Sequence, residues 1–96
     1  MDTCLPTGRE YQISMDYYTY VLKSEKDGRL YKGHTSDLTL RLSQHNTGKT
    51  KSTKGFMPWV LVYFESFKTI EDAVAREKFF KTGFGREYIK SILDKQ

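Results

Sequence analysis

The chain has 96 residues, of which 38% are hydrophobic and 15% aromatic, with 16 Lys and Arg residues against 12 Asp and Glu residues. This length suits one domain with a modest core, and the aromatic content argues against a disordered chain. No apolar run approaches the roughly 20 residues that span a bilayer, so we expect no membrane partner and a cytoplasmic location.

Cysteine and histidine are scarce in this sequence. Cys4 is the only cysteine, and the two histidines are His34 and His45. One cysteine excludes a disulfide framework within the chain, and two histidines are too few for the usual zinc site. A bound metal is therefore expected to be a hard cation held by oxygen.

The excess of positive charge falls in one segment. Between Asp37 and Glu65 the sequence has four basic residues and no acidic ones, whereas the remainder carries 12 of each sign. The four basic residues are Arg41, Lys49, Lys51 and Lys54. A local basic patch indicates a polyanionic partner, although charge alone equally allows a loop that lysines merely keep soluble.

The chain begins with a predicted tail and continues with a predicted hairpin. Residues 1–16 lack periodicity and predict a flexible tail, so the folded domain is assigned to residues 17–96. Aromatic and β-branched residues over 17–22 predict a strand, and Asp27 with Gly28 predicts a tight turn into a return strand over 29–33. Tyr20 and Tyr31 are therefore expected on neighbouring strands.

A helix is predicted next, capped by Ser36 or Asp37 and ended by Gly48. Arg41 and His45 lie one turn apart and share one face of this helix. The adjacent apolar stripe that would dock on the sheet consists of Leu38 and Leu42.

Residues 47–58 are rich in Lys, Thr, Ser and Gly and predict a long basic loop. The run Trp59–Phe67 predicts a third strand. It is apolar enough to be covered on both faces, so we expect it at the centre of the sheet.

The second predicted helix contains an acidic residue out of place. Thr69 with Asp72 resembles a capping box, and the helix is expected to run to Lys81. Its apolar stripe consists of Ile70, Ala73, Val74 and Phe80. Glu77 falls within that stripe, where a carboxylate costs desolvation free energy unless it is paired or binds a metal. Both interpretations stay open: a buried salt bridge, for example to Arg41, or a ligand for Mg²⁺.

A third helix is predicted from Gly85, with Tyr88 or Ile89 and then Ile92 and Leu93 facing inward.

Three other side chains suit phosphate chemistry, and each also has a plain structural explanation. A strand tyrosine such as Tyr31 is usually a core residue. As a base it needs nearby cations, because a phenol with a pKa near 10 is mostly protonated at neutral pH. Arg41 offers a bidentate fork for a phosphate, or is an ordinary surface residue. His45 suits a phosphate contact or a proton relay, or is merely solvated.

The order of these residues resembles that of the GIY-YIG nucleases. The resemblance rests on Tyr18-Thr19-Tyr20, on Tyr31-Lys32-Gly33 eleven residues after Tyr20, and on Arg41, His45-Asn46, Pro58-Trp59 and Arg76-Glu77-Lys78. It covers about residues 17–93 and is greatest for small stand-alone bacterial members, similar to the N-terminal nuclease domain of the bacterial excinuclease. It implies an α+β fold, with a three-stranded antiparallel sheet flanked by about three helices, and hydrolysis of DNA with one divalent metal, Mg²⁺ or Mn²⁺.

The resemblance also implies roles for individual residues. It makes Tyr31 the general base and Glu77 the metal ligand, and it has Arg41 stabilise charge on the scissile phosphate. Tyr20 is implied to orient the water or the phosphate, His45 to lie near the phosphate and His34 to assist the base. Nucleic-acid contacts are expected from the basic loop, at Lys49, Lys51, Lys54 and Trp59.

Three features depart from the family pattern. The first motif reads Tyr-Thr-Tyr, Lys32 replaces an apolar residue, and no asparagine follows Glu77. Alternatives to an endonuclease are therefore a nucleic-acid-binding module without turnover and a protein-interaction domain. Small nucleases of this kind commonly gain specificity from another protein or domain.

Overall fold

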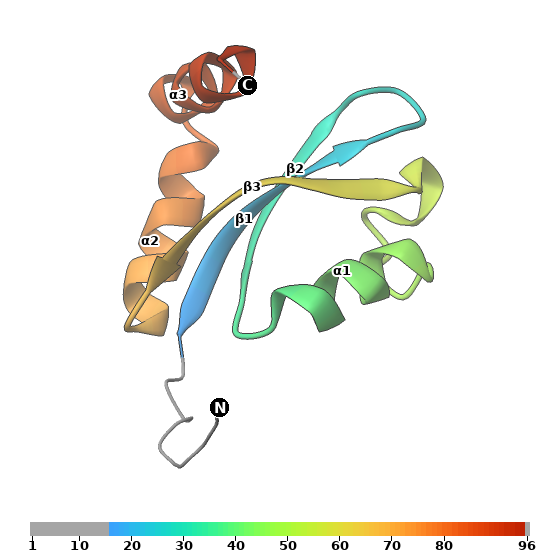
Figure 1. Cartoon of the computed structure of the whole chain (residues 1–96), viewed down its shortest axis with the longest axis horizontal. Helices are drawn as coiled ribbons and strands as arrows, with labels where there is room; N and C mark the ends of the chain where they lie inside the picture. The colour runs from blue at the N-terminus through green and yellow to red at the C-terminus, as the bar shows by residue number, and fades with distance from the viewer. Residues whose placement is uncertain (1–15, 96) are drawn as a thin grey trace, which may run out of the picture.

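The computed structural model describes residues 16–95, so Cys4 and nearly all of the predicted tail lie outside the described residues. Within these residues the fold has three strands, three α-helices and one short 3₁₀ helix, which confirms the predicted α+β class (Figure 1). In chain order they are β1 (Tyr17–Ser24), β2 (Leu30–Thr35), α1 (Leu38–Asn46), η2 (Lys54–Phe56), β3 (Trp59–Phe67), α2 (Ile70–Phe80) and α3 (Gly83–Asp94). Within residues 16–95, no helix has the length and apolar character needed to cross a membrane.

β1 is the central strand of the antiparallel sheet, whose order is β2-β1-β3. The prediction that the third strand sits centrally is therefore wrong. Val60 and Phe64 of β3 are 39% and 48% exposed, whereas Val21 of β1 is fully buried. An apolar run does not by itself distinguish a central strand from an edge strand. Here the hairpin places β2 on one edge of β1, and β3 pairs along the other edge.

The hairpin between β1 and β2 turns where the sequence predicts. Gly28 adopts a positive φ of 81°, which glycine tolerates without steric cost. The Asp27 side chain accepts a hydrogen bond from the Arg29 backbone N–H at 3.1 Å. This turn fixes the register that pairs Tyr20 with Gly33.

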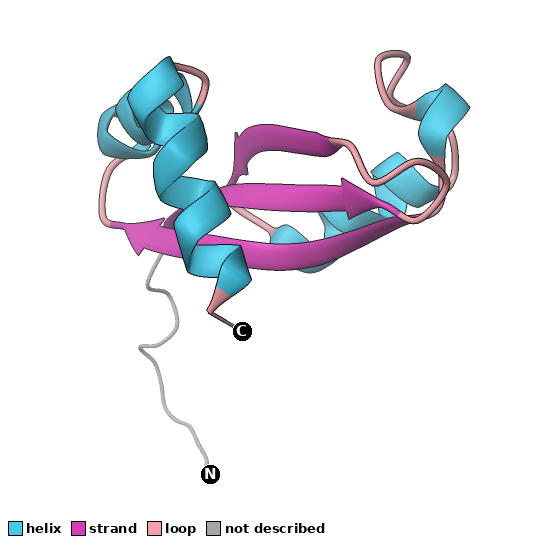
Figure 2. Cartoon of the chain, turned by 90° about the horizontal axis from the view of Figure 1, so that it is seen from above, coloured by secondary structure: helices cyan, strands magenta, loops and turns pink. Residues whose placement is uncertain are grey.

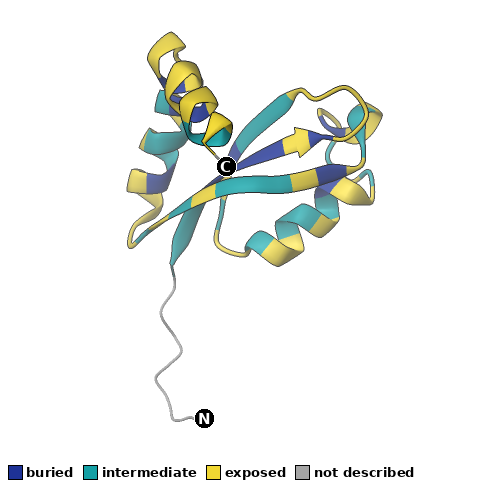
Figure 3. Cartoon of the chain, turned by 45° about the horizontal axis from the view of Figure 1, so that its top comes forward, coloured by how far each residue is buried: buried dark blue, intermediate teal, exposed yellow. Residues whose placement is uncertain are grey.

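α1 covers one face of the sheet, and α2 and α3 cover the other (Figures 1 and 2). Alternation along β1 sends Tyr20 and Leu22 to the α1 face and Val21 to the opposite face. Leu38 and Leu42 of α1 pack on the first cluster, which confirms the predicted docking stripe. The buried positions therefore lie mainly along β1, as Figure 3 shows.

The second cluster joins Val21 to Phe80 of α2 and Ile89 of α3. Of the two inward candidates in the third helix, Ile89 is buried and Tyr88 is 40% exposed. Ile70, expected in the apolar stripe of α2, is 43% exposed because it is the first residue of that helix, beyond the edge of the core.

Capping side chains mark the start of each α-helix. Asp37, Thr69 and Thr82 accept hydrogen bonds from backbone N–H groups in the first turns of α1, α2 and α3. α3 thus begins at Gly83, two residues before the predicted start. Gly85 is needed for packing instead, since a Cβ there would lie 1.8 Å from the carbonyl oxygen of Phe79.

Candidate active site

Tyr20 and Tyr31 lie on the α1 face of the sheet, with ring centroids 6.3 Å apart. Tyr20 is opposite Gly33 in the β1–β2 register, and Tyr31 is opposite Leu22. The prediction that the two tyrosines occupy neighbouring strands is confirmed.

Gly33 makes room for the phenol of Tyr20. A Cβ at this position would lie 2.5 Å from Oη and 2.7 Å from Cζ of Tyr20, closer than non-bonded atoms pack. A glycine in a strand often marks a place where a ligand or another chain segment approaches the backbone closely. In the structure the tyrosine occupies that space, so its hydroxyl reaches across β2, an edge strand.

A chain of hydrogen bonds runs from α1 through Tyr20 to the loop that follows α1. Nε of Arg41 donates to Oη of Tyr20 at 3.3 Å, and that oxygen lies 3.0 Å from Nε2 of His45. On the other side of the imidazole, Nδ1 of His45 lies 2.8 Å from Oγ1 of Thr53, which donates to the Thr50 carbonyl at 3.2 Å. Tyr20, His45 and Thr53 are all buried.

The hydroxyl of Thr53 decides which groups donate and which accept in these hydrogen bonds. A threonine hydroxyl has one proton, and Thr53 uses it toward the Thr50 carbonyl, so its oxygen accepts from Nδ1–H of His45. A neutral imidazole carries a single N–H, which leaves Nε2 to accept the phenol proton of Tyr20. Each buried side-chain N and O atom of Tyr20, His45 and Thr53 therefore has a hydrogen-bond partner.

Burial keeps the imidazole of His45 and the phenol of Tyr20 uncharged. Burial, and after it the charge of Arg41, lower the pKa of His45 to about 4. Burial likewise raises the pKa of Tyr20, although the hydrogen bond from Arg41 acts in the opposite direction. At neutral pH Tyr20 thus keeps its proton and acts as a donor to His45 and an anchor for Arg41.

Arg41 retains donors for a further ligand. Besides its contact with Tyr20, its Nη1 donates to Oε1 of Gln44 at 3.0 Å. A guanidinium has five N–H groups, so three remain beyond these two contacts. The hydrogen bond to Tyr20 also raises the pKa of Arg41, which is permanently charged. Such a group, held from behind by a buried network, is suited to a phosphate.

Tyr31 lies half-buried among aromatic rings. Its ring centroid is 4.9 Å from that of His45 and 6.2 Å from that of Trp59. It also interacts with Arg41, whose pKa it helps to raise after the larger contribution of Tyr20. The structure therefore brings together Tyr20, Tyr31, Arg41 and His45 from the predicted site.

Glu77 lies on α2 with its carboxylate between the side chains of His34 and Lys81. Oε1 is 2.6 Å from Nδ1 of His34, and Oε2 accepts from Nζ of Lys81 at 2.7 Å. Burial acts to raise the pKa of Glu77, but the hydrogen bonds and charges of Lys81 and His34 outweigh it and hold that pKa below its ordinary value. The example partner suggested by the sequence, Arg41, is not the one found.

The two clusters occupy opposite faces of β2. The tyrosines and Arg41 lie on the α1 face, whereas His34 and Glu77 meet on the α2 face. Because Tyr20 reaches over Gly33, the two groups are near each other, and the charge of Glu77 contributes to the raised pKa of Tyr20. His34, implied to assist the base Tyr31, contacts Glu77 instead.

The expected nucleic-acid contacts divide into exposed and buried residues. The side chains of the basic loop, at Lys49, Lys51 and Lys54, are exposed. Trp59 is only 3% exposed, and its Nε1 donates to the Thr53 carbonyl at 2.9 Å. Trp59 is thus a core residue, and its assignment to the nucleic-acid surface is wrong because the loop folds over it.

Thr53 is the buried side chain of the network that the sequence did not indicate. Its contact with His45 depends on the path of the loop over residues 47–58, and no spacing rule relates the two positions. A threonine within a polar loop carries no signal of its own.

The model of the GIY-YIG catalytic domain matches residues 16–89, which include both clusters. The chain belongs to the GIY-YIG family. It is 43% identical to a UPF0213 protein of Streptococcus agalactiae over 70 residues, 72% of this chain and 78% of that protein. It is 40% identical to a UPF0213 protein of Staphylococcus haemolyticus over 77 residues, 79% of this chain and 93% of that protein.

A solved structure of a similar protein supports the fold as well. The solution structure of the UPF0213 protein BH0048 from Bacillus halodurans matches with a TM-score of 0.50 and 33% identity. The match covers 81% of this chain and 85% of that chain. The GIY-YIG family is one of nucleases that generally use divalent metals.

The residues around Glu77 fit a weakly held divalent cation. The carboxylate is ionised and 17% exposed, and its two contacts leave further lone pairs on each oxygen. Residues 16–95 contain no group of three or more His, Cys, Asp or Glu side chains arranged to hold a metal. This donor set suits Mg²⁺, which keeps several waters and binds through one or two carboxylates plus substrate phosphate.

Proposed function

We propose that this GIY-YIG domain is a metal-dependent endonuclease that hydrolyses DNA phosphodiester bonds. The observation that carries the proposal is the buried hydrogen-bond chain, which holds Arg41 beside Tyr31 at the strand edge nearest Glu77. The intact network presents a charged phosphate-binding fork from a rigid support.

The two tyrosines have different roles in this proposal. Tyr20 is buried and its proton is committed to His45, so it positions Arg41. Tyr31 stands outside that chain and takes the proton from the attacking water. Arg41 holds the scissile phosphate and offsets the charge that develops on its oxygens.

Glu77 would hold the divalent metal, Mg²⁺ or Mn²⁺, through its ionised carboxylate. The bound cation would supply Lewis-acid stabilisation of the phosphate. His34 and Lys81 contact this carboxylate and lower its pKa, and Lys81 competes with the cation for it.

The test is cleavage of a labelled DNA panel with Mg²⁺ or Mn²⁺. The panel contains single-stranded, duplex, nicked and branched forms of one sequence, because a role in DNA repair or recombination would show as a preference for the last two. We expect the wild-type protein to cleave and Glu77→Gln to abolish that cleavage. Glu71→Gln changes the same chemical group at an exposed position of α2 and should cleave normally. Equal background cleavage by all three proteins would refute the nuclease.

A second candidate function is a nucleic-acid-binding module without turnover, which the absence of asparagine after Glu77 favours. In this case DNA binds mainly through the basic loop, with or without a partner protein that supplies specificity. The triple substitution Lys49→Ala, Lys51→Ala and Lys54→Ala then abolishes binding at low salt. Unchanged binding by that variant would eliminate this candidate.

A further inference from the structure

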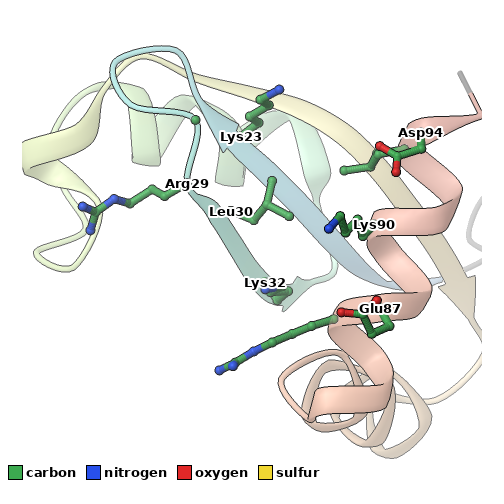
Figure 4. Close-up of a pocket in the computed structure, with 10 residues that line it drawn as sticks. Lys23, Arg29, Leu30, Lys32, Glu87, Lys90 and Asp94 are labelled. Atoms are coloured by element: carbon green, nitrogen blue, oxygen red, sulfur yellow. The ribbon is translucent and has the colours of Figure 1, made fainter.

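A groove of about 500 Å³ separates the β1–β2 hairpin from α3, on the face of the sheet opposite Tyr20 and Tyr31 (Figure 4). Leu30 and Leu93, which also pack on the core, contribute apolar surface to it. Figure 4 shows Lys23 and Lys32 on the strands and Lys90 extending from the helix toward them. We call this feature the hairpin groove.

Cations outnumber acids in the hairpin groove. Its basic side chains are Lys23, Arg29, Lys32, Arg86 and Lys90. Its acidic side chains are Glu87 and Asp94. Arg29 is paired with Asp27 outside the groove, at 2.8 Å. Among the ion pairs formed between residues 16 and 95, none includes Lys32, Arg86 or Lys90.

Lys32 shows that these cations crowd one another. It is half-buried on β2 and points to the face opposite Tyr31, since neighbouring side chains of a strand alternate. Burial, followed by the positive charges of Arg86 and Lys81, lowers the pKa of Lys32. Like charges held together without a counter-ion destabilise the free protein and are relieved by an anion.

The hairpin groove lies near the candidate metal ligand, with Lys81 between them. Lys81 is bonded to Glu77 on one side, and its charge acts on Lys32 on the other. The cations therefore extend from the candidate metal ligand along β2 to the hairpin. Two of them, Arg86 and Lys90, lie one helical turn apart and so share one side of α3.

We propose that the hairpin groove binds a second stretch of DNA backbone, separate from the scissile phosphate, through Lys32, Arg86 and Lys90. This inference rests on the proposed function for its choice of polyanion. DNA then contacts both sides of β2, since the basic loop follows α1 on the other face. Lys32, which replaces the apolar residue usual in the family, becomes a binding residue of this chain.

Binding is measured by fluorescence anisotropy over a range of salt concentrations, in Glu77→Gln protein so that no cleavage intervenes. The probes are a fluorescein-labelled single strand, a duplex and a three-way junction. The test variants are Arg86→Gln with Lys90→Gln, and Lys32→Leu. The matched control is Lys68→Gln with Lys78→Gln, which removes the same charge from exposed positions outside the groove.

We expect the Arg86 and Lys90 pair of substitutions to weaken binding to at least one probe by about tenfold or more at moderate salt. The slope of log K against log salt should fall by about two, since each lost phosphate contact accounts for roughly 0.9 on duplex DNA. Lys32→Leu should lower this slope by about one, and the control pair should leave the slope unchanged. Arg86 and Lys90 are exposed helix positions, so their substitution should leave the midpoint of urea unfolding unchanged.

Failure of this inference is distinct from failure of the nuclease. If wild-type protein cleaves DNA, and the groove substitutions change neither binding in the Glu77→Gln background nor cleavage in the wild-type background, the hairpin groove is refuted and the nuclease stands. If no protein cleaves but the groove variants still lose binding and salt dependence, the groove stands without the nuclease. Equal losses in the groove and control variants would also overturn the groove, because net charge alone would explain them.

Discussion

Nδ1 of His45 lies 2.8 Å from Oγ1 of Thr53, and this contact places the imidazole proton on Nδ1. Nε2 is thereby left to accept the hydrogen bond from Tyr20. The basic loop thereby reaches the candidate active site through one buried threonine. The basic loop and the position of Arg41 are connected by a continuous set of hydrogen bonds.

Thr53→Val keeps the shape of the side chain but leaves Nδ1–H of His45 without an acceptor. We expect a loss of about 1–3 kcal/mol in the free energy of unfolding, the usual cost of an unsatisfied buried polar group. Urea denaturation measures this loss, and ¹⁵N NMR of the imidazole reports whether the proton moves to Nε2. Thr50→Val is the matched control, since Thr50 joins the chain only through its carbonyl. Equal stability losses in both variants would contradict the network.

His45 predicts a pH dependence of stability. Its pKa is about 4 in the folded protein against an ordinary 6.5, so the unfolded chain binds a proton more readily. The stabilisation from neutral His45 is therefore complete above pH 6.5 and is lost as the pH falls to about 4, with a total of about 3 kcal/mol. The difference in unfolding free energy between wild type and His45→Gln should shrink over that range. His34→Gln is the comparison. If the difference in unfolding free energy between wild type and His34→Gln shrinks over the same pH range, His45 is not the source of the pH dependence.

Gly33→Ala would place a Cβ 2.5 Å from Oη of Tyr20. Overpacking of this kind costs about 1–3 kcal/mol, and it should also displace Arg41 through the phenol. Gly55→Ala meets nothing within 4 Å and should be nearly neutral. In a double-mutant cycle, Tyr20→Leu should relieve most of the cost of Gly33→Ala. Additive losses in the cycle would mean that the two residues do not conflict.

Substitution of Tyr20 should lower the stability of the protein, whereas substitution of Tyr31 should lower its activity. Tyr20→Phe removes the link between Arg41 and His45. It should lower the free energy of unfolding by about 1–3 kcal/mol and also weaken phosphate binding. Tyr31→Phe should leave the unfolding free energy within about 0.5 kcal/mol of wild type, since its hydroxyl lies outside the buried chain. If Tyr31 is the base, cleavage by Tyr31→Phe falls by roughly 10²–10⁴. Full activity of the Tyr31→Phe protein would remove it from the mechanism.

Lys81→Met should tighten binding of a divalent cation at Glu77. The ammonium lies 2.7 Å from the carboxylate and competes with a metal for it, whereas methionine keeps an unbranched side chain without charge. Removing about 1 kcal/mol of surface repulsion corresponds to roughly fivefold tighter binding of Mn²⁺ in a titration. The exposed Lys78, replaced in the same way, should change the affinity little. Weaker binding to the Lys81→Met protein would show that Lys81 supports the site instead.

Much of the fold was predictable because it depends on local rules. The Asp27-Gly28 turn, the Asp37 and Thr69 caps and the face shared by Arg41 and His45 are all consequences of sequence spacing. The centre of the sheet was not predictable in this way. Which strand has two neighbours depends on pairing between segments about 40 residues apart, and β3 is as apolar as a central strand.

The sequence also decided that Glu77 is exceptional, because a carboxylate within an apolar stripe requires a partner wherever the helix packs. It did not decide which partner. His34, 43 residues earlier, reaches Glu77 only because α2 packs against β2, and Trp59 is buried only because the loop folds over it.

Spacing along the chain thus determined the helices, the turn and the charged residue that has to be explained. Tertiary structure alone decided the contacts that give those residues their chemistry: Tyr20 over Gly33, Thr53 against His45, and the cations gathered beside α3. The physical reason is that hydrogen-bond direction, burial and charge crowding depend on distances in space. Segments remote in sequence set those distances only when the sheet and its two helical layers assemble.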